Sequence, residues 1–361
     1  MKQSTNVVKY CIDLRISNEI LRARQPKVTR LWFLADRVHL ETGVPPILGK
    51  EEKVLKKSIL FLIFLLFLAS NYFPEILTIF HAGSLTKPLN EVAVLFKKSH
   101  PDLEVRFESS GSLIVARKIT ELGKIPDIAL FADYRIFTLF LFPDFASFQV
   151  RFASNSMVLA FTENSRYSEE LNDSNWFEII FRPDVKFGYS NPDIDPCGYR
   201  ALMVCKLAEK HYGVPNIFQK LKTSKNALIL KKSVDLVSYL QLGELDYAFL
   251  YRSEAVSSGL KFIEFPAEIN LAFEEFKTSY KNAVVEITGK DGEKTKVTGE
   301  PIYYSFTVPV GAQNRKTAVE FLKFLLSKEG KAVFKKYGFI VFEEPIVDFP
   351  ENLPEELKGV F

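Results

Sequence analysis

The chain has 361 residues, 47% of them hydrophobic and 25% charged, a length that suits two α/β lobes better than one small domain. This composition excludes disorder, collagen and a coiled coil as descriptions of the whole chain. The net charge of +3 is uneven, because residues 1–57 carry 12 Lys and Arg against 6 Asp and Glu, which leaves −3 for the rest. A mildly acidic body argues against a nucleic-acid partner.

Residues 54–70 have the pattern of a signal peptide or signal anchor. Lys53, Lys56 and Lys57 precede an uninterrupted apolar run, ILFLIFLLFLA, at residues 59–69. As a helix this run spans about 16 Å, less than the roughly 30 Å of a bilayer's hydrocarbon core. A buried core helix is the alternative, but such a helix would carry polar residues at helical spacing, and this run has none. We expect a secreted or extracytoplasmic protein, held to the membrane by this segment if it is not cleaved.

The signal pattern starts unusually far along the chain. Residues 1–53 show no clean amphipathic period, and the next methionine after Met1 is Met157. We therefore expect residues 1–53 to be an upstream extension that results from a start site assigned too early, with the natural start near Val54. The alternative is a genuine cytosolic extension on a signal anchor, which would suit a membrane-tethered anion sensor.

Strand and helix patterns alternate along the rest of the chain. Strands are expected at residues 77–81, 103–107, 126–131, 157–161, 185–189, 247–251 and 302–308. Helices are expected at residues 85–96, 112–122, 196–211, 233–242, 316–327 and 329–337. A Gly/Asp turn joins residues 284–287 and 294–297 as a hairpin. This alternation predicts a mostly parallel sheet with helices on both faces.

Catalytic motifs are missing from the sequence. It has no P-loop, no nucleophile elbow, no His-Glu-x-x-His and no dinucleotide glycine pattern after a strand. Three cysteines and four histidines form neither a disulfide framework nor zinc spacing. We therefore expect a protein that is not an enzyme and that has no cofactor.

Three strand-to-helix turns carry the features of an anion site. Gly83-Ser84 and Gly111-Ser112 each place a hydroxyl at the start of a helix, and Asp195-Pro196-Cys197 opens a third helix. A helix N-terminus offers unpaired N–H groups and a partial positive charge. Each turn alone is an ordinary helix cap. Three such turns at the carboxyl ends of strands, where open α/β sheets bind ligands, favour an anion site.

Five segments carry the most specific patterns of the chain. They are HAGSL at His81–Leu85, SGSLIVARKITELGK at Ser110–Lys124, FADY at Phe131–Tyr134, SNPDIDPCGYR at Ser190–Arg200 and GELDYAFLYRS at Gly243–Ser253. Together they resemble the archaeal molybdate/tungstate-binding proteins of ABC importers, and the resemblance extends from about Leu77 to Leu357.

The resemblance implies the type II periplasmic-binding-protein fold, an α/β fold with mixed sheets flanked by helices and the ligand in the cleft between two lobes. It assigns residues 75–155 plus 266–361 to lobe I and residues 156–265 to lobe II. It also implies capture of a tetrahedral oxyanion, molybdate or tungstate, for delivery to the permease subunits of an ABC transporter. Sulfate has the same shape and charge and is the alternative ligand.

The resemblance also implies which residues hold the anion. These are Gly83, Ser84, Ser112, Asp195, Pro196, Cys197 and Tyr251. The residue chemistry agrees, because hydroxyls, a phenol and backbone N–H groups are neutral donors that can be fixed around a desolvated dianion and leave no unpaired cation in an empty site.

Asp195 has two interpretations. It is a strong N-cap for the helix that begins at Pro196. In the family, a carboxylate here and a Glu from a Lys-Glu-x-Asp-Leu pattern bind the metal of the anion directly, which raises its oxygen ligands from four to six. In this chain that pattern reads KSVDL at Lys232–Leu236, so Ser233 stands at the Glu position and is a further candidate donor. We therefore expect Asp195 to be the single metal-ligating side chain and the anion to be four- or five-coordinate.

Overall fold

The computed structural model describes residues 58–62 and 75–359 and divides the chain into two units, residues 1–73 and 74–361. In the first unit, residues 58–62 are helical. The expected upstream extension and most of the expected signal segment lie outside the described residues. Among the residues that are described, no helix is long and apolar enough to cross a membrane.

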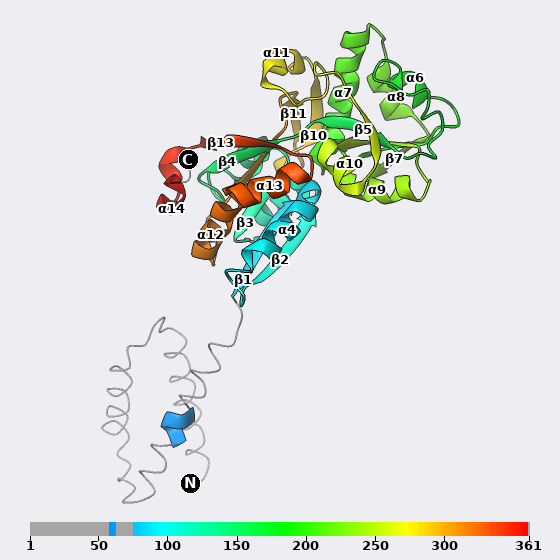
Figure 1. Cartoon of the computed structure of the whole chain (residues 1–361). Helices are drawn as coiled ribbons and strands as arrows, with labels where there is room; N and C mark the ends of the chain where they lie inside the picture. The colour runs from blue at the N-terminus through cyan, green and yellow to red at the C-terminus, as the bar shows by residue number, and fades with distance from the viewer. Residues whose placement is uncertain (1–57, 63–74, 360–361) are drawn as a thin grey trace, which may run out of the picture. The chain divides into compact units, whose positions relative to one another are not determined.

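A six-stranded mixed sheet organises one part of the second unit, with the strand order β13-β4-β12-β3-β1-β2 (Figure 1). Its strands are β1 (Ile76–Ala82), β2 (Glu104–Ser110), β3 (Ile128–Phe131), β4 (Gln149–Ser154), β12 (Tyr303–Thr307) and β13 (Ile340–Asp348). β1 pairs in parallel with β2 and β3, whereas β12 pairs antiparallel to β3 and β4.

Helices pack on this sheet and on one another. α4 (Thr86–Phe96), α12 (Arg315–Leu326) and α13 (Lys328–Lys336) are in mutual contact, and α5 (Ser112–Thr120) packs against β1, β2 and the π-helical turn η2 (Phe137–Leu141). A 3-10 turn, η1 (Gly83–Leu85), leads from β1 into α4. The C-terminal part ends with η5 (Pro350–Asn352) and α14 (Glu355–Lys358), which contacts α12.

A five-stranded mixed sheet organises the other part, with the order β7-β6-β8-β5-β9. Its strands are β5 (Met157–Phe161), β6 (Phe187–Ser190), β7 (Ala227–Leu230), β8 (Tyr247–Tyr251) and β9 (Lys261–Glu264). Its helices are α6 (Trp176–Ile179), α7 (Pro196–Tyr212), α8 (Ile217–Thr223), α9 (Ser233–Gln241) and α10 (Arg252–Ser258).

The segment between β9 and β12 forms a separate hairpin. It contains η3 (Glu274–Phe276), α11 (Lys277–Tyr280), β10 (Val284–Thr288), the turn η4 (Lys290–Gly292) and β11 (Lys294–Thr298). β10 and β11 pair antiparallel, which confirms the expected hairpin, and β10 packs against α7 (Figure 1).

Alternating side chains along β8 show how this strand joins two layers. Tyr247, Phe249 and Tyr251 belong to the large core that includes the inner face of α7. Ala248 and Leu250 belong to a second, smaller core with residues of α9 and α10. Because successive strand residues point to opposite faces, β8 directs Tyr251 toward α7 and its neighbour Leu250 toward α9 and α10.

The predicted strands and helices from residue 77 onward are confirmed, with boundaries shifted by a few residues. The expectation of a mostly parallel sheet is wrong, because both sheets mix parallel and antiparallel pairs. The antiparallel pairs are β12 with β3 and β4, β13 with β4, and β5 with β8 and β9. These strands do not need the helical crossover that a parallel pair requires.

Candidate anion site between the two sheets

Two glycines allow elements of the two sheets to approach closely. A Cβ atom on Gly111, just before α5, would lie 2.2 Å from the carbonyl oxygen of Ile194 in the loop after β6. A Cβ atom on Gly83 would lie 3.3 Å from Cγ2 of Val234 on α9. The turn that carries Ser84 therefore lies against the first turn of α9, and the turn that carries Ser112 lies against the loop that leads into α7.

Ser84 is buried and joins a chain of hydroxyl and amide groups. Its Oγ lies 2.8 Å from the phenol oxygen of Tyr304 on β12. The same phenol oxygen is 3.4 Å from Nδ2 of Asn155, which also donates to Oγ of Ser253 at 2.7 Å. Asn155 lies between β4 and β5, so this series of hydrogen bonds connects the six-stranded sheet with α10.

Ser112 and Tyr251 are connected through one peptide group and one guanidinium. The N–H of Ala132 donates to Oγ of Ser112 at 3.1 Å. The carbonyl oxygen of Ala132 accepts from Nη1 of Arg200 at 2.7 Å. The same Nη1 lies 2.6 Å from the phenol oxygen of Tyr251. A guanidinium can only donate, so this phenol oxygen is an acceptor here and its own O–H is left free to donate to a ligand. Burial raises the pKa of Tyr251 well above its usual value, which keeps that proton in place.

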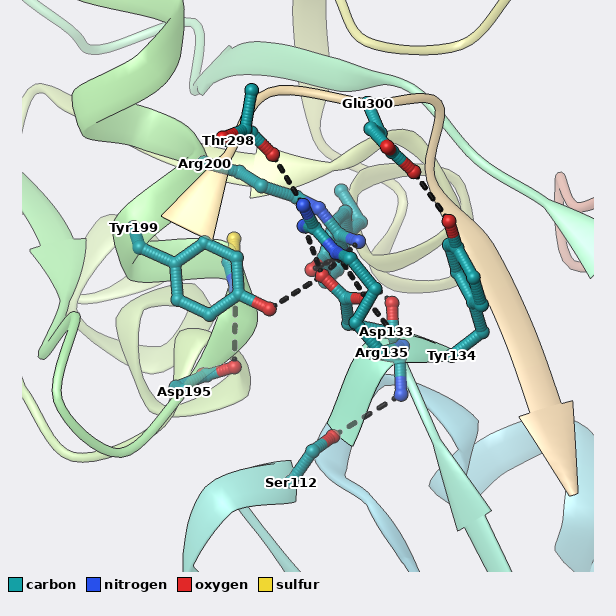
Figure 2. Close-up of polar contacts among 12 residues, drawn as sticks. Ser112, Asp133, Tyr134, Arg135, Asp195, Tyr199, Arg200, Thr298 and Glu300 are labelled. Atoms are coloured by element: carbon teal, nitrogen blue, oxygen red, sulfur yellow. Dashed lines mark hydrogen bonds and ion pairs between the residues drawn. The ribbon is translucent and has the colours of Figure 1, made fainter. Parts of the chain in front are cut away.

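Asp133 connects α7 with the segment after β3 through a buried cluster of charges (Figure 2). Its Oδ2 accepts from Nη2 of Arg200 at 2.9 Å, from the hydroxyl of Tyr199 at 2.6 Å and from Nη2 of Arg135 at 2.6 Å. Burial alone would raise the pKa of Asp133, but the charges of Arg135 and Arg200 outweigh it and hold that pKa below its ordinary value. The fully buried Arg200 thus bridges elements of both sheets.

Asp195 caps two helices at once. Its Oδ1 accepts from the N–H of Cys197 at 3.2 Å, which makes it the N-cap of α7 with Pro196 at the first helical position. Its Oδ2 accepts from the N–H of Ser233 at the start of α9, at 2.8 Å. Burial raises the pKa of Asp195, although the two backbone N–H groups oppose this rise. The cap interpretation of Asp195 therefore holds in this structure, and the N–H groups of Cys197 and Ser233 are both bonded to its carboxylate.

The thiol of Cys197 is not a reactive group. It is fully buried, with its Sγ 3.7 Å from the carbonyl oxygen of Phe249. Burial raises its pKa well above the usual value, so the sulfur remains a neutral thiol. What Cys197 offers to the site is therefore its backbone N–H, which here donates to Asp195.

Glu254 is a residue of the site that sequence reasoning missed. It is buried on the first turn of α10, where its Oε1 accepts from the hydroxyl of Ser233 at 2.6 Å and its Oε2 from the N–H of Tyr251 at 3.1 Å. Burial raises the pKa of Glu254 to about 8; the hydrogen bond from Ser233 opposes this rise, and the charge of Asp195 adds to it. The available signal was an acidic residue three positions after the end of the expected strand at 247–251, the spacing of a capping box.

Three further residues of the site were also missed. They are Asp133, Arg200 and Tyr304. Asp133 and Arg200 lie inside quoted motifs, but nothing in a linear pattern shows that an Asp after one strand meets an Arg 67 residues later.

Two mixed sheets flanked by helices, with buried polar side chains between their facing elements, are the arrangement of a two-lobed solute-binding protein. The chain matches the family of bacterial extracellular solute-binding proteins over residues 77–340 and belongs to it. This is a family of transport proteins and not of enzymes, as the sequence predicted, and its members act outside the cytoplasm.

The chain is similar to named members of this class. It is 42% identical over 312 residues to a molybdate/tungstate-binding protein, WtpA, of Pyrococcus abyssi, covering 79% of this chain and 89% of the relative. It is 37% identical over 319 residues to an uncharacterized solute-binding protein of Petrotoga mobilis, covering 85% of this chain and 98% of the relative. Among solved structures, the periplasmic molybdate-binding protein of Azotobacter vinelandii aligns with a TM-score of 0.56 at 16% identity, covering 73% of this chain and 98% of that chain. That alignment confirms the two-lobed fold.

Proposed function

We propose that this protein captures molybdate or tungstate outside the cytoplasm and delivers it to the permease subunits of an ABC transporter. The observation that carries the proposal is the close approach of the Gly83-Ser84 turn to the first turn of α9 and of the Gly111-Ser112 turn to the loop before α7, with Ser84, Ser112 and Ser233 buried. The 42% identity to a molybdate/tungstate-binding protein supports the choice of anion.

The proposed anion contacts are neutral groups. Gly83, Ser84 and Ser112 lie at helix starts that follow strands of the six-stranded sheet, whereas Cys197 is in the first turn of α7 and Tyr251 ends β8 of the five-stranded sheet. Helix starts offer N–H groups and partial positive charge, which favour an oxyanion without a lysine. Binding would require the anion to replace Asp195 as the acceptor for the N–H of Cys197, or to bind beside it.

The proposed lobes are residues 75–155 plus 266–361 and residues 156–265, with the anion between them. All six strands of one sheet fall in the first set and all five strands of the other in the second. The site residues are buried, so an anion must enter while these lobes are apart and be enclosed as they close. Attachment to the membrane through the N-terminal apolar segment, if it is uncleaved, belongs to the same proposal.

The test is thermal unfolding of the full chain with molybdate, tungstate, sulfate, phosphate or chloride. A ligand that binds only the folded state raises the midpoint by an amount that grows with its concentration. We expect molybdate and tungstate to raise it at micromolar concentration and sulfate only at much higher concentration. A larger rise with sulfate would assign the protein to sulfate instead, and no rise with any oxyanion would contradict the proposal.

A further inference from the structure

The β10–β11 hairpin belongs to neither of the two large sheets. It lies on the return of the chain from β9 to β12, and its two strands form a sheet of their own. A two-stranded hairpin is only marginally stable by itself in water. Val285, Ile287 and Val297 of the hairpin are buried in the large core, and β10 packs against α7. The hairpin therefore depends on α7 of the five-stranded part, although the chain continues from it into the six-stranded sheet.

The outer edge of β10 is occupied by groups from elsewhere in the molecule. The carbonyl oxygen of Val284 accepts from Nζ of Lys206 on α7. The N–H of Thr288 donates to Oδ1 of Asp193 at 2.7 Å, and its carbonyl oxygen accepts from Nη2 of Arg117 at 2.5 Å. A strand edge offers unpaired N–H and C=O groups to whatever binds there. Here these groups are bonded by residues that belong to both proposed lobes.

Arg117 connects three segments of the chain. It lies on α5, which packs against strands of the six-stranded sheet. Its Nη1 donates to the carbonyl oxygen of Asp193 at 3.2 Å, in the loop between β6 and α7. Its Nη2 donates to the hairpin, at Thr288 and, at 3.4 Å, at Gly289. A guanidinium presents its donors in a rigid planar fork, so it can bond carbonyls of two segments at once, which an ammonium does less well.

Asp193 completes this junction from the side of the loop. Its carboxylate accepts from Thr288 and its carbonyl oxygen from Arg117, so one residue is bonded by both the hairpin and α5. Its own N–H donates to Oδ1 of Asn191 at 2.9 Å, which fixes the loop internally.

The junction lies beside the proposed anion site and not in it. Asp195, the N-cap of α7, comes two residues after Asp193, and Ser112 begins the helix that carries Arg117. An α-helix keeps its residues at fixed spacing, so a bond between Arg117 and the loop also fixes where Ser112 lies relative to the start of α7. Arg117 and Asp193 are therefore positioning residues.

We propose, on the basis of the proposed function, that Arg117, Asp193 and Thr288 form a latch that holds the closed protein shut and sets how long the anion stays bound. The latch joins α5 of one proposed lobe to the loop before α7 of the other, and the hairpin fastens both. Separation of the lobes breaks the bond between Arg117 and Asp193. Because the latch forms only after the anion has entered, its loss speeds dissociation and leaves association nearly unchanged.

The dissociation rate of tungstate from the full chain tests this latch. Radiolabelled tungstate is bound and then chased with excess unlabelled tungstate, and calorimetric affinities combined with these rates give the association rates. We expect Arg117→Gln to release tungstate at least about tenfold faster, with association changed by less than about twofold. Arg106→Gln is the matched control, since Arg106 lies exposed on β2 and pairs with Glu104 of the same strand. It should change neither rate.

Two variants at Asp193 separate its hydrogen bond from its charge. Asp193→Asn keeps an oxygen that accepts from the N–H of Thr288, so its dissociation rate should stay within about threefold of the parent's. Asp193→Ala removes the acceptor and should release tungstate at least about tenfold faster. Because both residues act in one latch, combining Asp193→Ala with Arg117→Gln should have less effect than the product of the two single changes.

Hydrogen exchange measured by mass spectrometry reports on the latch itself. Peptides that cover residues 190–195 and 284–298 should exchange faster in Arg117→Gln than in Arg106→Gln, and bound tungstate should slow their exchange in the parent. Unfolding midpoints identify any variant that fails to fold. If Arg117→Gln is such a variant, the comparison of Asp193→Asn with Asp193→Ala decides.

Several results would overturn the latch. They are an unchanged dissociation rate in Arg117→Gln, release from Asp193→Asn as fast as from Asp193→Ala, a loss of affinity that comes from association alone, and equal exchange of the hairpin peptides in Arg117→Gln and the control. A parent that binds no oxyanion in the calorimeter would overturn the proposed function, and the latch with it, which is a different result from any of these.

Discussion

Nη1 of Arg200 donates to the phenol oxygen of Tyr251 at 2.6 Å, and both side chains are buried between α7 and β8. Tyr251 is a proposed anion contact. Arg200 also bonds Asp133, so this contact connects Tyr251 with the charge cluster between the two sheets. In the proposed closed state, the contact between the two sheets and the orientation of the phenol are therefore linked through one guanidinium. Separation of the sheets would remove Asp133 from Arg200 and loosen the phenol.

Arg200→Lys should weaken molybdate or tungstate binding by about ten- to a hundredfold, because an ammonium cannot bond Tyr251, Ala132 and Asp133 in one plane. Most of the loss should be in the dissociation rate, since the closed state loses a bridge between the sheets. Stopped-flow mixing gives both rate constants. Arg135→Lys is the control, since Arg135 also bonds Asp133 but makes no contact with Tyr251. Equal losses in the two variants would mean that Arg200 has only a structural role.

Ser84→Ala and Ser112→Ala should each weaken anion binding by about 1.5–3 kcal/mol, the usual worth of a hydrogen bond to a charged group. Their effects on stability should differ. Ser112→Ala leaves the buried N–H of Ala132 without its partner and should lower the free energy of unfolding by about 1–3 kcal/mol. Ser84→Ala should cost less, because the phenol of Tyr304 keeps Asn155 as a neighbour. Calorimetry and urea unfolding give both quantities, and unchanged affinity in both variants would place the anion elsewhere.

Gly111→Ala should impair anion binding more than Gly83→Ala does. The new methyl group at residue 111 would lie 2.2 Å from a backbone oxygen of Ile194, which must move, whereas at residue 83 it would meet the side chain of Val234 at 3.3 Å. The first change keeps apart the elements that must close on the anion. Affinity measurements on both variants, with unfolding midpoints as a check of the fold, give the comparison. A larger effect at Gly83 would contradict this geometry.

The stability of the ligand-free protein should fall as the pH rises from about 4.5 to about 8. Burial raises the pKa of Glu254 from 4.5 to about 8, so in this range the folded state binds a proton that the unfolded state has lost. The stabilisation is complete below pH 4.5 and is gone once Glu254 ionises in the folded protein. Asp195 shifts in the same direction.

The groups that face Glu254 are consistent with a raised pKa and with a stability that falls as the pH rises. Asp195 and Asp235 add negative charge from α7 and α9, and the phenols of Tyr251 and Tyr304 stay neutral because their pKa values are raised by burial. Unfolding midpoints between pH 5 and pH 8.5 test the prediction, and Glu254→Gln should show a smaller decline than the parent. An equal decline in the two proteins would assign the pH dependence to other groups.

The order of strands and helices was predictable because each element has a local cause. The strand at 77–81 and the helix from Pro196 are examples, since an apolar run and a proline at the first helical turn act within a few residues. The mixed pairing of the two sheets was not predictable from such signals. β12 and β4 are more than 140 residues apart in sequence, and their antiparallel pairing depends on how the chain returns after it crosses between the sheets.

The class of the protein was predictable from its five specific segments, and the three helix starts were predictable because glycine, serine and N-cap residues act through their own backbone. What surrounds these helix starts depends on tertiary packing. It brought Glu254 on α10 to Ser233 on α9, and Arg200 to Asp133 and Tyr251. Side chains from distant segments meet only after the sheets have packed, and the energy of a buried charge depends on these neighbours and not on its place in the chain.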